Sequence, residues 1–411
     1  MKGSLLKVFY LFLVLVFISS CKEEKPKTGL KLGIWRGEIT AQNNQIPFNF
    51  EIYKKNDSIR INLINGDEKL PIDEVYLIKD TISFNMFIFD SEINGKIDST
   101  CTSMNGFYTR KYAEDYSLPF KALYNKPGRV DNASSDGSFD GKWETVFKDS
   151  KGKESKAIGI FHTKDQILKG TFLTPTGDYR YLDGYTDKDT MFLYSFDGNQ
   201  IFKFKAHKLN DSVMKGEFWS GKAGYKTFIS KRNDTARLPD ADKITFLKEG
   251  YDKIDFSFKN LDGKPVSLNN EKYKGKVVVL QIFGTWCPNC MDETRFLAGW
   301  YKKNRHRGVE IIGLAYENKE DFEYAKSRVE KMVKKLNIDY DFVIAGTSQI
   351  ESVSQSLPML DNVISFPTSI FIDKTGKVRK ILAGFNGPAT GKYYQEFTED
   401  FNRYINVLLK E

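Results

Sequence analysis

The sequence predicts a multidomain protein in which an all-β N-terminal part precedes an α/β domain. Residues 30–232 contain short runs of alternating apolar and polar residues that are bounded by Asn, Asp and Gly. That pattern is typical of antiparallel strands with one buried face. From about residue 250, nearly continuous apolar runs alternate with amphipathic stretches, which indicates an α/β layer fold. The length of 411 residues also favours two or three domains over a single core.

Residues 1–20 have the features of a bacterial lipoprotein signal peptide. Two lysines precede an uncharged apolar run at 8–18, which is too short to span a bilayer and suits a secretory signal. Two serines stand directly before Cys21, in a pattern that resembles the lipobox. The resemblance implies cleavage before Cys21 and lipid on that cysteine, with residues 21–29 as a polar tether. An ordinary cleavable signal or an N-terminal anchor is the alternative.

A lipidated Cys21 places the expected protein in the cell envelope. Each buried methylene of an acyl chain contributes about 0.8 kcal/mol to membrane binding, so the lipid would hold the chain to a membrane leaflet. The expected location is the outer membrane or a membrane face that borders the periplasm. The segment 22–24, Lys-Glu-Glu, resembles the export signals that carry some Bacteroidetes lipoproteins to the cell surface.

Composition excludes several classes of function. The net charge of +8 comes from both signs interspersed along the chain, without a basic block, so nucleic acid is not an expected partner. Four cysteines are too few for a disulfide scaffold, and three scattered histidines leave little material for a metal centre. No metal and no cofactor are therefore expected.

The β part is expected to contain two related units, at 30–125 and 139–232, joined by a Gly-, Asn- and Ser-rich linker. Three tripeptide landmarks recur in the same order, 33–35 with 141–143, 79–81 with 188–190, and 104–106 with 214–216. Such self-similarity indicates duplication. The Gly-x-Trp starts look like small lipocalin-like barrels or half-barrels in which Trp35 and Trp143 plug the core. The lone Cys101 is interpreted as a small buried hydrophobe, and the alternative is an exposed thiol that pairs with a partner.

The α/β domain is expected over residues 250–411. Its apolar runs predict buried strands, and the first run is nearly continuous, as a strand covered on both faces requires. Amphipathic stretches predict three helices, the first of which begins at the pair Cys287 and Cys290. The expected strands are 277–283, 309–315, 340–345 and 368–373, and the expected helices run to residue 303, over 319–336 and over 393–409.

A Cys-x-x-Cys pair at the start of a helix indicates redox chemistry. Unpaired N–H groups and a partial positive charge at a helix N-terminus stabilise a thiolate. Cys287 is therefore expected to be the exposed attacking thiolate, and Cys290, one turn on, to resolve the mixed disulfide. Half of a zinc site is the alternative, but the chain has no second Cys-x-x-Cys and only His306 nearby.

Residues 250–411 resemble the TlpA/ResA-type thiol-disulfide oxidoreductases, an extracytoplasmic branch of the thioredoxin fold that is related to the AhpC/TSA proteins. The resemblance covers the whole domain. It rests on the Trp-Cys-x-x-Cys motif and on the stretches 256–268, 274–280 and 365–373, the last of which matches the cis-proline loop of the family.

The resemblance implies further site residues. Pro367 would be the cis-proline that packs against the cysteine pair, and the backbone of Phe366 would pair with the extended chain of a substrate. Trp286 and Pro288 would also contact the substrate. Glu293 matches a glutamate that tunes or shuttles protons at the thiols. The alternative for Glu293 is a solvated carboxylate on the helix face.

Three positions depart from the patterns of relatives. The dipeptide Pro288-Asn289 differs from that of many relatives and leaves the reduction potential open. Gln281 stands where thioredoxin has a buried acid, which places the demand for proton transfer on Glu293. Arg295 replaces a common proline, and its charge near the helix start would favour the thiolate further.

The expected function is that of an extracytoplasmic, membrane-anchored reductase of disulfides in client proteins, kept reduced by an upstream membrane thiol donor. A disulfide oxidase or isomerase would use the same residues. A thiol peroxidase shares the fold but needs Pro and Thr where Leu280 and Gly284 stand. From a different class, the chain could be a binding lipoprotein whose β units capture a ligand or partner.

Overall fold

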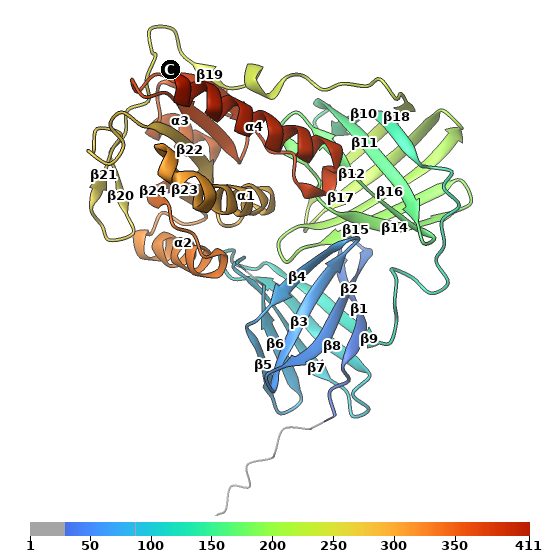
Figure 1. Ribbon diagram of the computed structural model, residues 1–411. Coiled ribbons are helices and arrows are strands. Elements are labelled where there is room, and N and C mark those ends of the chain that lie inside the picture. Colours follow the sequence, from blue (N-terminus) through green and yellow to red (C-terminus); the bar gives the residue numbers. More distant parts are fainter. Residues whose placement is uncertain (1–28, 87) are drawn as a thin grey trace, which may run out of the picture.

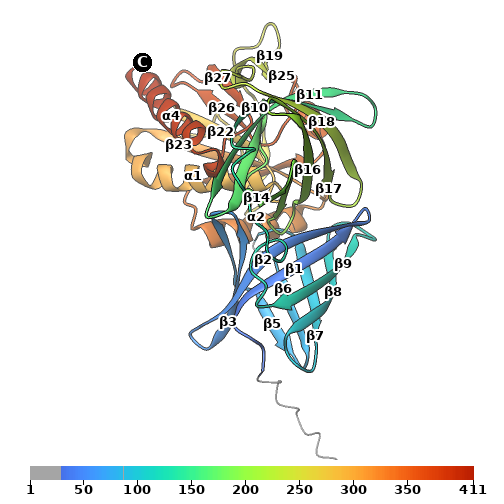
Figure 2. The same ribbon diagram turned by 90° about the vertical axis from the view of Figure 1, so that its right-hand side faces the viewer.

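The computed structural model describes residues 29–86 and 88–411, which form two curled β-sheets beside a layered α/β domain (Figures 1 and 2). The expected signal peptide, the lipidation site Cys21 and most of the tether lie outside the described residues. We refer to residues 30–125 as the first β region, to 139–232 as the second β region, and to 250–411 as the α/β domain.

The first β region is one antiparallel sheet. Its strand order is β4-β3-β2-β1-β9-β8-β7-β6-β5. Two-residue turns with left-handed backbone, such as Asn56 and Asp57 with φ of 49° and 58°, connect neighbouring strands, and Asn and Asp tolerate that conformation well. The strands are β1 (Gly33–Ala41), β2 (Asn44–Lys55), β3 (Ser58–Asn65), β4 (Glu68–Ile72), β5 (Val75–Ile78), β6 (Thr81–Asn85), β7 (Ser91–Ile97), β8 (Ser103–Arg110) and β9 (Ser117–Tyr124).

The second β region closes into a barrel. Its sheet has the order β11-β10-β18-β17-β16-β15-β14-β12-β13, and β11 also pairs with β12, which joins the two sides of the sheet. Buried aromatic side chains fill its interior, as in small closed barrels. The strands are β10 (Gly141–Asp149), β11 (Glu154–Lys164), β12 (Ile167–Thr174), β13 (Gly177–Asp178), β14 (Leu182–Asp187), β15 (Thr190–Phe196), β16 (Ile201–Asn210), β17 (Val213–Ser220) and β18 (Gly224–Arg232).

The two tryptophans occupy matching places in the two β regions. Trp35 and Trp143 are fully buried, as expected for core plugs. Each indole N–H donates to a carbonyl four residues upstream, Lys31 at 3.0 Å and Phe139 at 2.9 Å. The all-β, barrel-like character of this part of the chain is thus confirmed, whereas its lipocalin-like nature stays a prediction.

The α/β domain contains a mixed sheet in the order β21-β20-β24-β23-β22-β26-β27, with β22, β23 and β24 parallel. The strands of the domain are β20 (Phe258–Asn260), β21 (Pro265–Val266), β22 (Val277–Phe283), β23 (Val309–Glu317), β24 (Asp341–Thr347), β25 (Leu360–Asp361), β26 (Thr368–Ile372) and β27 (Val378–Ala383). Its α-helices are α1 (Pro288–Asn304), α2 (Phe322–Leu336), α3 (Ile350–Ser356) and α4 (Lys392–Lys410), and short 3-10 turns lie at η2 (Arg305–Arg307) and η3 (Pro388–Thr390). Before the domain lie a 3-10 turn, η1 (Ala241–Lys243), and the strand β19 (Phe246–Leu247), which pairs with β25 in a separate two-stranded sheet.

Alternate residues of β22 face two different apolar layers. Val277 and Val279 pack with residues of α1, α2 and α4, whereas Val278 and Leu280 pack with residues of α3 on the other side. A strand covered on both faces has no solvent-facing position, which explains its nearly continuous apolar run. The expected thioredoxin fold is confirmed, and the expected strands and helices are present with ends shifted by a few residues. Helix α3 and strands β20, β21 and β27 were not predicted.

The three parts of the chain pack against one another. The phenol of Tyr324 on α2 donates to Asp90 of the first β region at 3.0 Å, and Lys331 pairs with Glu74 at 2.8 Å. Between the β regions, the predicted linker contains the buried Arg129, whose guanidinium donates a hydrogen bond to Asp183 of the second β region at 3.0 Å. No helix among the described residues is long and apolar enough to cross a membrane.

Candidate redox site

The pair Cys287 and Cys290 forms a disulfide at the N-terminus of α1. The chain leaves β22, turns at Gly284 and enters the helix through Cys287 as N-cap and Pro288 as first helical residue, a position where proline is favoured. A side chain at Gly284 would collide with the Trp286 ring, so the turn requires glycine. The indole of Trp286 donates to the carbonyl of Tyr316 at 2.8 Å, which fixes the start of the motif.

Cys287 lies where the helix can stabilise a negative charge on sulfur. The backbone N–H of Cys290 donates to Sγ of Cys287 at 3.2 Å. Cys287 is only 6% exposed and Cys290 is fully buried. The expectation of an exposed Cys287 is therefore wrong for this disulfide-bonded structure, because neighbouring loops cover the motif.

The cis-proline loop lies against the disulfide. The Phe366–Pro367 peptide is cis, and the carbonyl oxygen of Phe366 is 3.6 Å from Sγ of Cys287. The Phe366 ring packs edge-on against Trp286, with ring centroids 5.3 Å apart. Tertiary structure thus brings Trp286, Cys287, Phe366 and Pro367 together around one pair of sulfurs.

Glu293 is a buried carboxyl on the same helix. Its side chain accepts hydrogen bonds from Gln281 at 2.8 Å and from Ser369 at 2.9 Å. Burial raises the pKa of Glu293 to about 7, although the two hydrogen bonds favour the ionised form. Glu293 is 1% exposed, so the alternative of a solvated carboxylate is wrong. Gln281, which cannot itself exchange a proton, positions the Glu293 carboxyl through this hydrogen bond.

A second buried carboxyl was missed by the sequence reasoning. Glu317 at the end of β23 accepts hydrogen bonds from the backbone N–H and the hydroxyl of Thr285, both at 2.8 Å. Burial raises the pKa of Glu317 to about 7. An acid two residues after the apolar run 309–315 was the available signal, because the carboxyl ends of parallel strands meet at one edge of a sheet.

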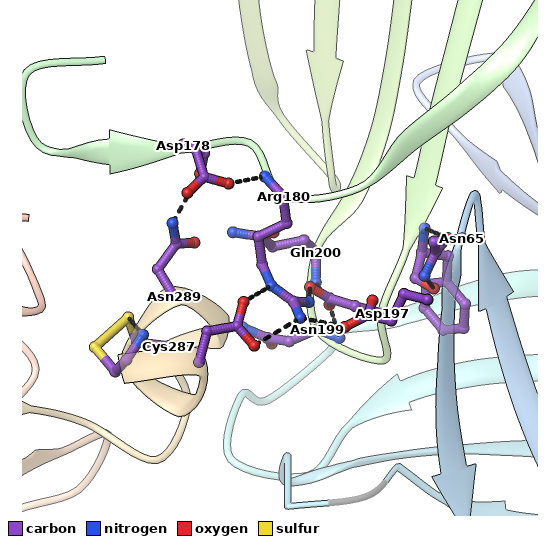
Figure 3. Close-up of polar contacts among 12 residues, drawn as sticks. Asn65, Asp178, Arg180, Asp197, Asn199, Gln200, Cys287 and Asn289 are labelled. Atoms are coloured by element: carbon purple, nitrogen blue, oxygen red, sulfur yellow. Dashed lines mark hydrogen bonds and ion pairs between the residues drawn. A yellow bond between two sulfur atoms is a disulfide. The ribbon is translucent and has the colours of Figure 1, made fainter. Parts of the chain in front are cut away.

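The second β region covers the other side of the motif (Figure 3). The side-chain amide of Asn289 donates to the carbonyl of Asp178 at 2.9 Å. The side-chain amide of Asn199 donates to the carbonyl of Trp286 at 2.7 Å. These contacts join residues that are 87 and 111 positions apart in the sequence, so no local sequence pattern could predict them.

The remaining candidates lie away from the disulfide or pair within its surroundings. Cys101 is buried in the first β region, as expected for a structural thiol, and Cys21 is outside the described residues. Arg295 forms an ion pair with Asp292 at 2.7 Å. Within 29–86 and 88–411, no group of three or more His, Cys, Asp or Glu side chains is arranged to hold a metal ion.

Sequence comparison relates the α/β domain to known proteins. The model of the AhpC/TSA family matches residues 250–381. The thiol-disulfide oxidoreductase ResA of Bacillus thuringiensis subsp. konkukian is 31% identical over 138 residues, which are 34% of this chain and 71% of that protein. ResA of Geobacillus thermodenitrificans is 31% identical over 140 residues, which are 34% of this chain and 72% of the relative. A solved thiol:disulfide interchange protein of Chlorobium tepidum TLS is 26% identical, with 39% of this chain and 98% of that chain covered and a TM-score of 0.30.

A disulfide at a helix start, beside a cis-proline and inside a thioredoxin fold, defines a thiol-disulfide oxidoreductase. The chain belongs to the ResA-like thiol-disulfide oxidoreductases of the AhpC/TSA family.

Proposed function

We propose that the protein is a membrane-anchored, extracytoplasmic reductase of disulfides in client proteins. The observation that carries the proposal is the Cys287–Cys290 disulfide at the N-terminus of α1, with the cis-proline loop against Cys287. In the reduced protein, Cys287 is the nucleophile because its sulfur lies at the helix N-terminus, and Cys290 is the resolving thiol.

The reaction consists of two thiol-disulfide exchanges. The thiolate of Cys287 attacks one sulfur of the client disulfide, which forms a mixed disulfide and releases the other client sulfur as a thiolate. The thiolate of Cys290 then attacks Sγ of Cys287, forms the Cys287–Cys290 disulfide and releases the second client thiol. Two electrons pass to the client, which takes up two protons, and an upstream membrane thiol donor restores the reduced pair.

Glu293 is the proposed proton acceptor for this cycle. Cys290 is buried and must lose its proton before it attacks, and Glu293 lies one helical turn further along α1. A carboxyl whose pKa is about 7 can accept that proton and release it again near neutral pH.

The direction of electron flow is set by the reduction potential of the Cys287–Cys290 pair. A reductase is expected to have a value near that of thioredoxin, about −270 mV. The potential is measured by equilibration of the full chain with dithiothreitol redox buffers and quantification of free thiols. A value near about −120 mV would instead identify an oxidase, and an intermediate value an isomerase.

Membrane anchoring through Cys21 has its own expected result. Replacement of Cys21 by Ala should move the protein from the membrane fraction to the soluble fraction, because the acyl chains are its proposed anchor. The measurement is fractionation of cells that express either form, together with incorporation of labelled palmitate. A Cys21→Ala variant that stays membrane-bound and labelled would contradict lipidation at this cysteine.

A binding role for the β regions is the second candidate function. The proposed units 30–125 and 139–232 then select partners with their outer surfaces, because buried side chains already fill the barrel of the second region. The observation that favours this role is that the second β region contacts the redox motif directly. Asn199 donates to the carbonyl of Trp286, and Asn289 donates to the carbonyl of Asp178.

A further inference from the structure

Arg180 lies where the three parts of the chain meet. Its buried guanidinium donates two hydrogen bonds to Asp292 on α1, at 2.7 Å and 3.1 Å. It also donates to Asp197 of the second β region at 2.9 Å and to Glu68 of the first β region at 2.5 Å. One cation from the loop after β13 therefore binds a carboxylate in each part. Figure 3 shows Arg180 beside Asp197.

Through Asp197, Arg180 also holds the loop that contacts the redox motif. The second carboxylate oxygen of Asp197 accepts the backbone N–H of Asn199 at 3.0 Å. The Asn199 amide in turn donates to the carbonyl of Trp286, the residue that precedes Cys287. The peptide unit in front of Cys287 is thus fixed by a chain of bonds that begins at Arg180.

Asp292 is a buried acid near the start of α1, on the same helix as the cysteine pair. It is only two residues beyond Cys290, in the part of α1 whose positive end favours a thiolate. A buried carboxylate at that place disfavours a second negative charge on sulfur. Arg180 offsets this charge from a side chain that is 3% exposed, and Arg295 offsets it from one that is 33% exposed and therefore more strongly screened.

The other ionisable groups at this contact show how tightly the charges are coupled. Burial alone would lower the pKa of Arg180, but the carboxylates of Asp292, Glu68 and Asp197 outweigh it and raise that pKa well above its usual value. Burial, together with the charge of Asp292, raises the pKa of Asp178 to about 6 against the hydrogen bonds that Asp178 accepts.

We propose that Arg180 is a positioning residue of the redox centre, which neutralises Asp292 and fixes the backbone in front of Cys287. The second β region thereby determines how readily Cys287 forms its thiolate. The inference rests on the proposed role of Cys287 as the nucleophile, and it extends that role to a residue outside the α/β domain.

The test compares the reactivity of Cys287 in reduced, full-length variants. The rate of alkylation by iodoacetamide is followed by mass spectrometry across the pH range in which the thiol titrates. Asp292→Asn is expected to raise the rate on the acid side about fivefold, and Arg180→Gln to lower it by a similar factor. The double variant Arg180→Gln/Asp292→Asn should be alkylated faster than Arg180→Gln, because the uncompensated charge of Asp292 is removed with its partner, whereas the support through Asp197 stays lost.

A matched control removes an arginine ion pair at a distance from the redox motif. Arg379 pairs with Asp373 and Glu411 in the α/β domain, and Arg379→Gln should leave the alkylation rate unchanged. The reduction potential supplies a second readout, since a less stable thiolate makes the pair more reducing. It should become more negative in Arg180→Gln and less negative in Asp292→Asn.

Shifts of the same sign in the two single variants, or a double variant that resembles Arg180→Gln, would overturn the inference. If Arg180→Gln does not fold, the test rests on Asp292→Asn, in which Arg180 keeps its two other carboxylate partners. An unchanged alkylation rate in Asp292→Asn would then refute the proposal. Alkylation of Cys290 in place of Cys287 would instead refute the nucleophile assignment. The potential of the pair would then still test the role of Arg180.

Discussion

Replacement of Cys287 by serine in the full chain is expected to abolish catalysis of insulin reduction with dithiothreitol as the electron donor. We expect the catalysed rate to fall about a thousandfold or more. A hydroxyl is far less acidic than a thiol and cannot form a disulfide. Cys290 cannot substitute for Cys287, because its side chain is fully buried behind the first turn of α1. The measurement is the rate of insulin precipitation with each variant at equal concentration.

Cys290→Ser separates nucleophile from resolving thiol. This variant keeps the attacking sulfur but cannot clear the mixed disulfide, so a covalent adduct of enzyme and client should accumulate on a non-reducing gel. Cys101→Ser is the matched control, since that buried thiol lies in the first β region, and its turnover should be unchanged. A Cys287→Ser variant that keeps its rate, or an adduct formed through Cys290, would refute the mechanism.

Glu293→Gln is expected to change the pH dependence of both activity and stability. In the unchanged protein the rate of insulin reduction should rise through about pH 7 as Glu293 loses its proton and becomes an acceptor. Glutamine has the same shape but cannot accept the proton. The variant should lose this inflection and about a hundredfold in rate above pH 7. A pH–rate profile that Glu293→Gln leaves intact would exclude Glu293 as the acceptor.

The stability effect of Glu293 has a defined sign. Its folded pKa of about 7 is above the usual value of 4.5, so the folded protein holds this proton more tightly than the unfolded chain. The free energy of unfolding should therefore fall as the pH rises from 4.5 to about 7, by on the order of 3 kcal/mol. Glu293→Gln removes this loss and should be more stable than the unchanged protein above pH 7.

Urea unfolding at about pH 5 and about pH 8 measures this difference. Glu317, whose pKa burial also raises to about 7, adds a similar dependence to both proteins. The change in pH dependence between variant and unchanged protein therefore isolates Glu293. Parallel stability curves for the two proteins would show that Glu293 titrates normally.

Much of the fold could be predicted from local sequence patterns. The apolar run of β22, the Cys-x-x-Cys at the start of α1 and the alternation in the β regions each reflect interactions within one element or with its immediate cover. The short helix α3 and the short strands β20 and β21 lacked such a signal, because a few residues define no period. The barrel closure through β11 and β12 depends on how far the sheet curls, which no local pattern records.

The sequence by itself determined the chemistry that the site offers: two thiols one turn apart at a helix start, a cis-proline motif and an acid on the following turn. Only the tertiary structure decided that Cys287 is covered, that Glu293 and Glu317 are buried, and that Arg180 stands beside Asp292. The physical reason is that periodicity and capping are properties of neighbouring residues. Desolvation and buried ion pairs depend on which distant segments meet, and that is settled only when the three parts of the chain pack together.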